Sequence, residues 1–218
     1  MTRKTRSTAG EAGRSPAAGR PVRERIVAAA FSAFRKRGFS AATTDEIARL
    51  AKASKRELYA CFENKQEMLI AGIAEHAKRI RPPLDLPAPT SREALMRALT
   101  QFGTATLRGV CEPGVLAVYR LAIGESERSP NIARTLDSAG REANRVALAA
   151  FLAKAVENDL LAHEDPAVMA EFYSSLLWGG LLIRVLLRVA DVPPVDEMEH
   201  RAGVASRMLL ACFPGTRR

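Results

Sequence analysis

The segment SKRELYACFENKQEML, residues 54–69, places a basic pair and a tyrosine between two polar helix starts. A helix confined between those starts buries little surface and is barely stable by itself. Its exposed polar end is therefore its useful part, and Lys55, Arg56 and Tyr59 are suited to contact a polyanion. Recognition of a charged partner, rather than bond-making chemistry, is what this segment indicates.

The sequence contains no recognisable catalytic constellation. Its three histidines, His76, His163 and His200, are scattered, and there is no HExxH motif and no glycine-rich phosphate loop. The segment GESERS around Ser126 lacks the second glycine of a GxSxG nucleophile elbow. We therefore expect no enzyme and no cofactor.

The cysteines and the apolar runs indicate the compartment in which the chain works and whether it enters a membrane. Cys61, Cys111 and Cys212 form no CxxC pair, which argues against a disulfide framework and a zinc site and favours a reducing, cytoplasmic compartment. The basic N-terminus lacks the apolar stretch of a secretory signal. Arg184 and Arg188 interrupt the most apolar run, so we expect a buried helix there and no membrane insertion.

The positive charge is concentrated in the first part of the chain. The net charge is +9, and residues 1–80 hold 17 Lys and Arg against 8 Asp and Glu, so the whole excess lies there. Residues 1–20, a Gly-, Ala- and Ser-rich arm expected to be disordered, account for +4, and residues 21–80 account for the other +5. A neutral body with a basic head is typical of a protein that binds a polyanion.

Helical periodicity and capping residues divide the basic head into four helices. Apolar residues at helical spacing predict a first helix that Gly38 ends. Three capping boxes follow, TTDE, SKRE and NKQE, and each marks a further helix start. The predicted helices span 22–37, 43–51, 54–61 and 64–80.

Two short helices packed on a longer one form the helix-turn-helix plan. We expect this plan to present the second short helix to the major groove of DNA, where its side chains can touch base edges. The residues expected to face inward are Ile47, Ala48, Leu50, Ala51, Leu58 and Phe62. Those expected to face outward are Lys55, Arg56, Tyr59 and Ala60.

A proline-rich stretch, RPPLDLPAPT, separates this head from the rest of the chain. Beyond it, serine and proline helix starts predict five helices, at 91–109, 113–127, 130–158, 166–190 and 194–212. No segment shows the alternation typical of a strand. We expect an all-α fold of about nine helices, divided into an arm (1–20), a head (21–80) whose three-helix helix-turn-helix unit precedes a fourth helix, and a helical body (81–218).

The segment FRKRGFSAATTDEIARLAKASKRELYACFENKQEML resembles the DNA-binding head of the TetR/AcrR transcriptional regulators over about residues 22–70. Downstream, VLAVYRLAIGESERSPNIARTL resembles an AefR-like C-terminal subtype of that family. The matching positions in the head are Gly38, Phe39, Thr43, Thr44, Ile47, Ala48, Ser54, Leu58, Tyr59, Phe62 and Lys65.

The resemblance implies phosphate contacts from the start of the first short helix, from Tyr59 and from Lys65, and base contacts from the basic pair. The structural alternatives are that Tyr59 is a packing aromatic and Lys65 a solvated cation. Lys52 stands where the family usually has the glycine of the turn, which leaves the turn geometry open. The arm either enters a neighbouring minor groove or is a solubilising tail. The implied DNA-binding residues are Thr43, Thr44, Lys55, Arg56, Tyr59 and Lys65.

By the same resemblance, the last two helices form a homodimer interface. The run EFYSSLLWGGLLIRVLL is apolar on all sides, which is more than one helix face of a monomer buries. The alternative is that both helices belong to an ordinary core. The candidate interface residues are Gly179, Gly180, Ile183, Val204, Met208 and Cys212.

The resemblance also implies a ligand pocket inside the body. A mainly apolar pocket favours a small hydrophobic or amphipathic effector. For each candidate residue the alternative is an ordinary core position. The candidate lining residues are Phe102, Thr106, Tyr119, Ile123, Phe151 and Trp178.

These features together predict a ligand-responsive transcriptional regulator. By the family's default it is a repressor that binds a palindromic operator in double-stranded DNA as a homodimer and is released by its effector. The competing interpretation is a helical interaction protein that applies its basic face non-specifically to polyanions or membrane surfaces.

Overall fold

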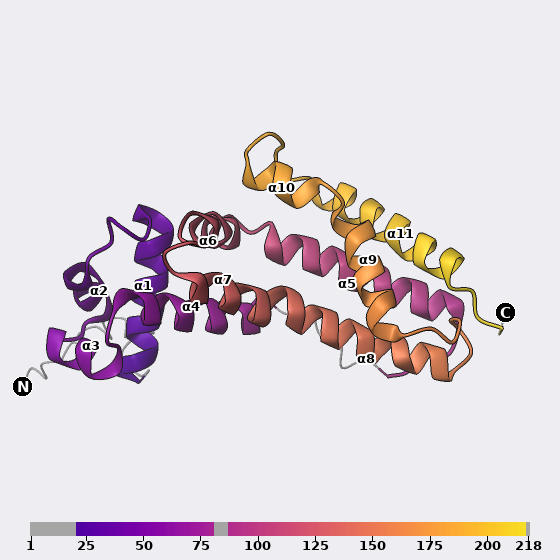
Figure 1. The fold of residues 1–218 in the computed structure, drawn as a ribbon, viewed down its shortest axis with the longest axis horizontal. Coiled ribbons are helices and arrows are strands. Elements are labelled where there is room, and N and C mark those ends of the chain that lie inside the picture. Colours follow the sequence, from indigo (N-terminus) through magenta and orange to yellow (C-terminus); the bar gives the residue numbers. More distant parts are fainter. Residues whose placement is uncertain (1–20, 81–86, 217–218) are drawn as a thin grey trace, which may run out of the picture.

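The computed structural model describes residues 21–80 and 87–216, which form an elongated bundle of helices (Figure 1). The first three helices lie at one end, and the C-terminal helix runs along the opposite end (Figure 1). The predicted arm and part of the proline-rich stretch lie outside the described residues. The elements are α1 (Val22–Arg37), α2 (Thr44–Ala51), α3 (Lys55–Cys61), α4 (Lys65–Ile80), α5 (Arg92–Val110), α6 (Pro113–Gly124), α7 (Pro130–Leu136), the π-helix η1 (Asp137–Glu142), α8 (Ala143–Glu157), α9 (Pro166–Trp178), α10 (Leu181–Leu186) and α11 (Val195–Cys212).

The predicted all-α fold is confirmed. The described residues form helices and no strand, apart from an isolated antiparallel bridge between Leu161 and Pro214. The four helices of the head begin and end within one residue of the predicted bounds. The capping residues explain this agreement, because they fix helix starts through contacts with their own neighbours in the chain.

Two helices that the sequence predicts as continuous are interrupted. The helix expected over 166–190 ends as α9, because Gly179 has a φ of 46°, and α10 then begins at Leu181. The helix expected over 130–158 contains η1 between α7 and α8. A π-helical turn inserts a residue into the helical register and occurs frequently at functional sites.

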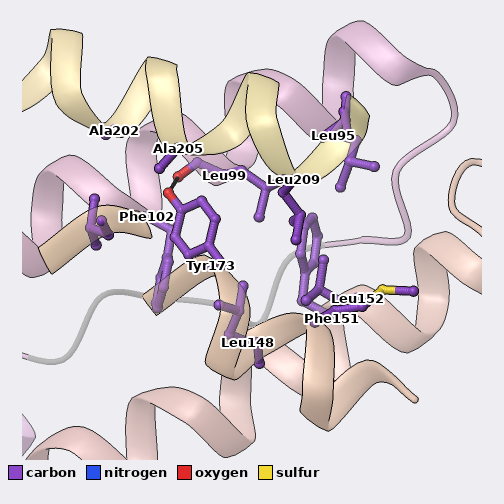
Figure 2. Close-up of a cluster of buried hydrophobic side chains, with 14 of the residues drawn as sticks. Leu95, Leu99, Phe102, Leu148, Phe151, Leu152, Tyr173, Ala202, Ala205 and Leu209 are labelled. Atoms are coloured by element: carbon purple, nitrogen blue, oxygen red, sulfur yellow. Dashed lines mark hydrogen bonds between the residues drawn. The ribbon is translucent and has the colours of Figure 1, made fainter. Parts of the chain in front are cut away.

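The body is held together by a hydrophobic core between α5, α8, α9 and α11. Tyr173 lies fully buried within it, and its hydroxyl donates a hydrogen bond of 2.7 Å to the carbonyl oxygen of Leu99 (Figure 2). Burial raises the pKa of Tyr173 to about 12. This phenol thus brings α9 and α5 together while satisfying its own polar group.

A second hydrophobic core joins α1, α2, α3 and α4 and continues into α6 and α7. Ile47 and Leu58 are fully buried in it, as predicted. Leu50 was expected there too, but it is 47% exposed, because it lies beside the inward face of α2. Val118 and Ile132 belong to the same core, although both lie in the body. This core therefore packs the head against the body.

Two arginines close helix ends within the body. Arg201 of α11 donates from Nε to the carbonyl oxygen of Leu177 at 2.7 Å and from Nη2 to that of Trp178 at 3.1 Å. Arg120 of α6 binds the last carbonyl oxygens of α10 in the same way, at 2.9 Å each. Terminal helix carbonyls lack partners within their own helix, so these guanidinium groups stabilise the ends of α9 and α10 and attach them to neighbouring helices.

The turn between α2 and α3 yields a stability prediction. Lys52 adopts a left-handed conformation there, with a φ of 51° and a ψ of 46°. This conformation strains a residue that has a Cβ by about 1 kcal/mol, so Lys52→Gly should raise the free energy of unfolding by about that amount. Urea denaturation measures the change. Ala150→Gly, in the exposed middle of α8, is the control and should lower the same quantity by about 1 kcal/mol.

Candidate nucleic-acid interface and ligand cavity

The N-terminus of α3 is fixed by a complete capping box. The hydroxyl of Ser54 accepts from the backbone N–H of Glu57 at 3.2 Å, and the Glu57 carboxylate accepts from the Ser54 backbone N–H at 2.7 Å. The hydrogen bonds that the Glu57 carboxylate accepts from the backbone N–H and the hydroxyl of Ser54 hold the pKa of Glu57 below its usual value. Leu58 is the buried residue of this seven-residue helix, so α3 is attached to the head by a single buried side chain and its cap.

The outer face of α3 is open to solvent, as predicted. Lys55, Arg56, Tyr59 and Ala60 are all exposed. The ammonium group of Lys55 lies 2.8 Å from the carboxylate of Asp45, and this hydrogen bond raises the pKa of Lys55. Both partners are exposed, so the ion pair is weak and Lys55 can exchange it for another anion.

A hollow of about 430 Å³ lies between the N-termini of α2 and α4. The hydroxyl oxygens of Thr44 and Tyr59 line it and lie 3.3 Å apart, where they form a hydrogen bond. Thr43, in contrast, caps α2 by accepting from the backbone N–H of Glu46 at 3.2 Å. Two helix N-termini with hydroxyl groups between them suit a phosphate group, for which these hydroxyl groups can exchange their mutual hydrogen bond. The hollow is lined by Phe39, Thr44, Tyr59, Glu63, Asn64, Lys65 and Gln66.

Lys65 has a structural role that the sequence did not reveal. Its ammonium group donates to the carbonyl oxygens of Phe39 and Ala42 at 2.9 Å each, and to that of Ser40 at 3.4 Å. It also lies 5.0 Å from the centre of the Phe39 ring. The ammonium group therefore holds the loop between α1 and α2 in place, and its contact with phosphate stays a prediction.

The body contains a cavity of about 780 Å³. Five of the predicted lining residues, Phe102, Thr106, Tyr119, Ile123 and Trp178, do line it. Phe151 does not, because it packs into the body core and is 2% exposed (Figure 2). We therefore correct Phe151 from a pocket residue to a core residue.

Helices of the head also line this cavity, and the sequence analysis missed them. Ile73, His76 and Ala77 contribute from α4, and Phe31 contributes from α1. The signal was the spacing of the three α4 residues, which places them on one helix face. They were assigned to the head, so their contact with the body was not foreseen.

The π-helix η1 forms another part of the cavity wall, where Asp137 and Arg141 carry the charge. The guanidinium of Arg141 lies 2.7 Å from the carboxylate of Asp137 and 3.6 Å from that of Glu171 on α9. The hydrogen bond with Asp137 raises the pKa of Arg141. This ion-pair cluster joins η1 to α9 at a partly exposed edge of the cavity.

The predicted dimer residues lie on α10, on α11 and in the turn between α9 and α10. Ile183 is 52% exposed and Met208 is 49% exposed. Gly179, Gly180 and Cys212 are exposed, while Val204 is half-buried. Three further exposed apolar residues, which the sequence analysis did not include, lie between α10 and α11: Leu187, Val189 and Val192.

Residues 21–80 and 87–216 contain neither a cluster of metal-ligating side chains nor a helix able to span a membrane. No group of three or more His, Cys, Asp and Glu side chains there is arranged to hold a metal ion. No helix in this part of the chain has the length and apolar character needed to cross a bilayer.

Comparison with known families gives a match in each part of the chain. Residues 26–71 match the tetR family of bacterial regulatory proteins. Residues 97–214 match the C-terminal domain of AefR-like transcriptional repressors. The chain belongs to the TetR family of transcriptional regulators. DNA binding and dimer formation are properties of this family.

Individual TetR-family proteins share the fold over nearly the whole chain. YvkB, an HTH-type transcriptional regulator of Bacillus subtilis strain 168, is 24% identical over 83% of this chain and 93% of its own length. A TetR-family regulator from Mesorhizobium loti MAFF303099 has a TM-score of 0.78 at 20% identity, covering 92% of this chain and 100% of its own. The flavonoid-responsive regulator FrrA has a TM-score of 0.72 at 29% identity, covering 88% and 97%.

Lys65 of this TetR-family head can hold the loop between α1 and α2 or bind a DNA phosphate, and experiment can separate these two roles. Lys65→Met leaves the carbonyl oxygens of Phe39 and Ala42 without their donor and should lower the free energy of unfolding by about 1–3 kcal/mol. Lys55→Met removes an exposed ion pair and is the control, with an unchanged urea midpoint expected. If Lys65→Met weakened DNA binding and left stability unchanged, its ammonium group would act on phosphate and not on the loop.

Proposed function

We propose that this regulator binds a palindromic operator as a homodimer, and that a small, mainly apolar effector releases it. The observation that carries the proposal is the position of α4. Lys65 at its first turn borders the hollow beside α3, and His76 near its other end lines the body cavity. One rigid helix therefore takes part in both candidate sites. In this proposal, residues 21–80 bind DNA, and residues 81–218 bind the effector and form the dimer.

Recognition of the operator falls to the exposed face of α3. Arg56 is exposed there and, in the major groove, can bind both acceptors of a guanine, while Lys55 can leave Asp45 for a second base or a phosphate. Thr44 and Tyr59 offer hydroxyl groups to the phosphate of the hollow. In this arrangement Arg56 reads the base sequence, whereas Thr44 and Tyr59 position the head on the DNA backbone.

Exposed apolar side chains of α10 and α11 and of the segment between them support the homodimer. A palindrome requires two heads related by a twofold axis and about 34 Å apart. Ile183, Leu187 and Met208 are each about half or more exposed, and apolar side chains that gather into one patch on a surface mark an interface. Burying this surface against a second copy removes it from water and fixes the distance between the heads.

The cavity supports a small effector. Its volume of about 780 Å³ lies within the range that is typical of ligand sites. Aromatic side chains from α1, α5, α6 and α9 contribute to its wall. FrrA, whose structure is similar over most of the chain, responds to flavonoids, which are planar and aromatic. The AefR-like match over residues 97–214 supports repression as the mode of action.

Release follows if the effector prefers a conformation of the body in which α4 is displaced. The two heads would then no longer fit successive major grooves, and operator affinity would fall. By thermodynamic linkage, the operator must lower effector affinity by the same factor.

Selection of bound sequences from random duplex DNA tests the proposal directly. We expect a palindrome that binds at least ~10³-fold more tightly than random DNA. Arg56→Ala should relax the preference at one base pair of each half-site, with a loss of about 1–3 kcal/mol for the selected sequence and little change for random DNA. Equal affinity for all sequences in the unmodified protein would instead support a non-specific polyanion-binding protein.

The dimer prediction is tested by charge substitution on the apolar surface. Ile183→Arg should convert a homodimer into a monomer in analytical ultracentrifugation, because a buried, unpaired guanidinium strongly disfavours association. Val146→Arg is the matched control, since Val146 is 54% exposed on α8, away from α10 and α11, against 52% for Ile183. A dimer that persists in Ile183→Arg and dissociates in Val146→Arg would place the interface on α8.

A further inference from the structure

Two buried polar atoms in residues that line the cavity have no hydrogen-bond partner. They are Oγ1 of Thr106 on α5 and Nε2 of His76 on α4. Among the described residues, the remaining atom of this kind is Nε of Arg25, which lies in the head. Buried polar groups without partners are rare and destabilising, and each calls for an explanation. The grouping of two of them around one cavity suggests a partner supplied by the ligand.

The contrast with neighbouring threonines makes Thr106 distinctive. Thr100 donates to the carbonyl oxygen of Met96 at 2.9 Å, and Thr104 donates to that of Thr100 at 2.8 Å. Both hydroxyl groups thus turn back onto their own helix, one turn earlier. Thr106 lies on the same helix and makes no such bond. Threonine has two favourable rotamers in a helix, so one rotation about χ1 is enough to offer this hydroxyl to a ligand.

His76 is held in place without being satisfied. Its ring stacks on Phe31, with centroids 5.1 Å apart and planes 30° apart. Nε2 lies 3.2 Å from a carboxylate oxygen of Glu112, but the two are not aligned for a hydrogen bond. An imidazole nitrogen either donates or accepts according to its tautomer. The ring is therefore oriented, and its buried Nε2 is left without a hydrogen-bond partner.

The charges around the cavity disfavour an anion. Arg141 is already paired with Asp137 and Glu171, so carboxylates outnumber guanidinium groups in this cluster. Glu112 adds a further carboxylate beside His76. An anionic ligand would be repelled by these groups across a partly apolar medium.

We infer that the effector is an uncharged aromatic compound with a hydroxyl group, and that Thr106 and His76 bind this hydroxyl. A hydroxyl both donates and accepts, so it can satisfy either side chain. The rings of Phe31, Phe102, Tyr119 and Trp178 line the same cavity and can pack against planar rings. This inference rests on the proposed function, since it specifies the chemistry of the effector site.

Three probes of the same shape test it: biphenyl, 4-hydroxybiphenyl and biphenyl-4-carboxylate. Trp178 is the single tryptophan of the chain and lines the cavity, so quenching of its fluorescence reports binding in the full-length protein. We expect 4-hydroxybiphenyl to bind about tenfold more tightly than biphenyl, through the hydrogen bond that it adds. The carboxylate should bind more weakly than both.

Variants that remove the polar atoms and keep the shape of the side chain test whether Thr106 and His76 bind the hydroxyl. Thr106→Val removes the hydroxyl and keeps the shape, and it should reduce the preference for 4-hydroxybiphenyl while leaving biphenyl affinity unchanged. His76→Phe keeps a ring against Phe31 and should have a similar effect. Thr104→Val is the matched control, because the Thr104 hydroxyl is already bonded to its own helix. It should retain the preference.

Four results would overturn the inference. They are equal affinity for biphenyl and 4-hydroxybiphenyl, a preference that survives in both Thr106→Val and His76→Phe, tightest binding of the carboxylate, and no fluorescence response to any probe.

Gel shifts on the selected operator, run with the same probes, separate this inference from the proposed function. If biphenyl and 4-hydroxybiphenyl bind equally and release the operator equally, the hydroxyl inference fails and regulation by an apolar effector stands. If 4-hydroxybiphenyl binds preferentially and the operator stays bound, the chemistry of the site stands and release by this class of compound fails.

Discussion

The packing of α4 against α1 is the contact on which both candidate sites depend. Phe31 of α1 lies against Gly72 and against the ring of His76, one turn further along α4. A Cβ at Gly72 would lie 2.8 Å from the Phe31 ring, so the close approach of the two helices requires glycine there. The same core continues into α6 and α7. The head is therefore continuous with the wall of the cavity, and a displacement of α4 within the body must also displace α2 and α3, which are proposed to face DNA.

The sequence predicted well those features that depend on neighbouring residues. Thr43, Ser54 and Asn64 each accept a hydrogen bond from the backbone three residues later, and these local contacts set the starts of α2, α3 and α4. The outward face of α3 followed from helical spacing alone. Most of the candidate ligand residues do line the cavity, because aromatic and small polar side chains on α5, α6 and α9 share faces that turn inward, and their contact with a ligand stays a prediction.

The features that the sequence did not reveal depend on distant contacts. Lys65 binds carbonyl groups more than twenty positions earlier in the chain, and no local pattern shows that. Phe151 and the pocket aromatics are alike in sequence, and the packing of α8 against α9 decides which of them reaches the cavity. The π-helix has no capping signal, whereas the break at Gly179 had one that the surrounding apolar run concealed. The structural role of each of these residues depends on its neighbours in the folded chain and not on its residue type.

The guanidinium of Arg201 has a consequence for communication between protomers. It binds the carbonyl oxygen of Trp178, whose side chain lines the cavity, and it belongs to α11, whose outer side carries exposed Met208. In the proposed homodimer, a ligand that shifts the last turn of α9 would thereby shift the helix that faces the neighbouring copy. Occupancy in one subunit would be transmitted to the other through a short, charge-assisted link, and saturation would then follow a sigmoidal rather than a hyperbolic curve.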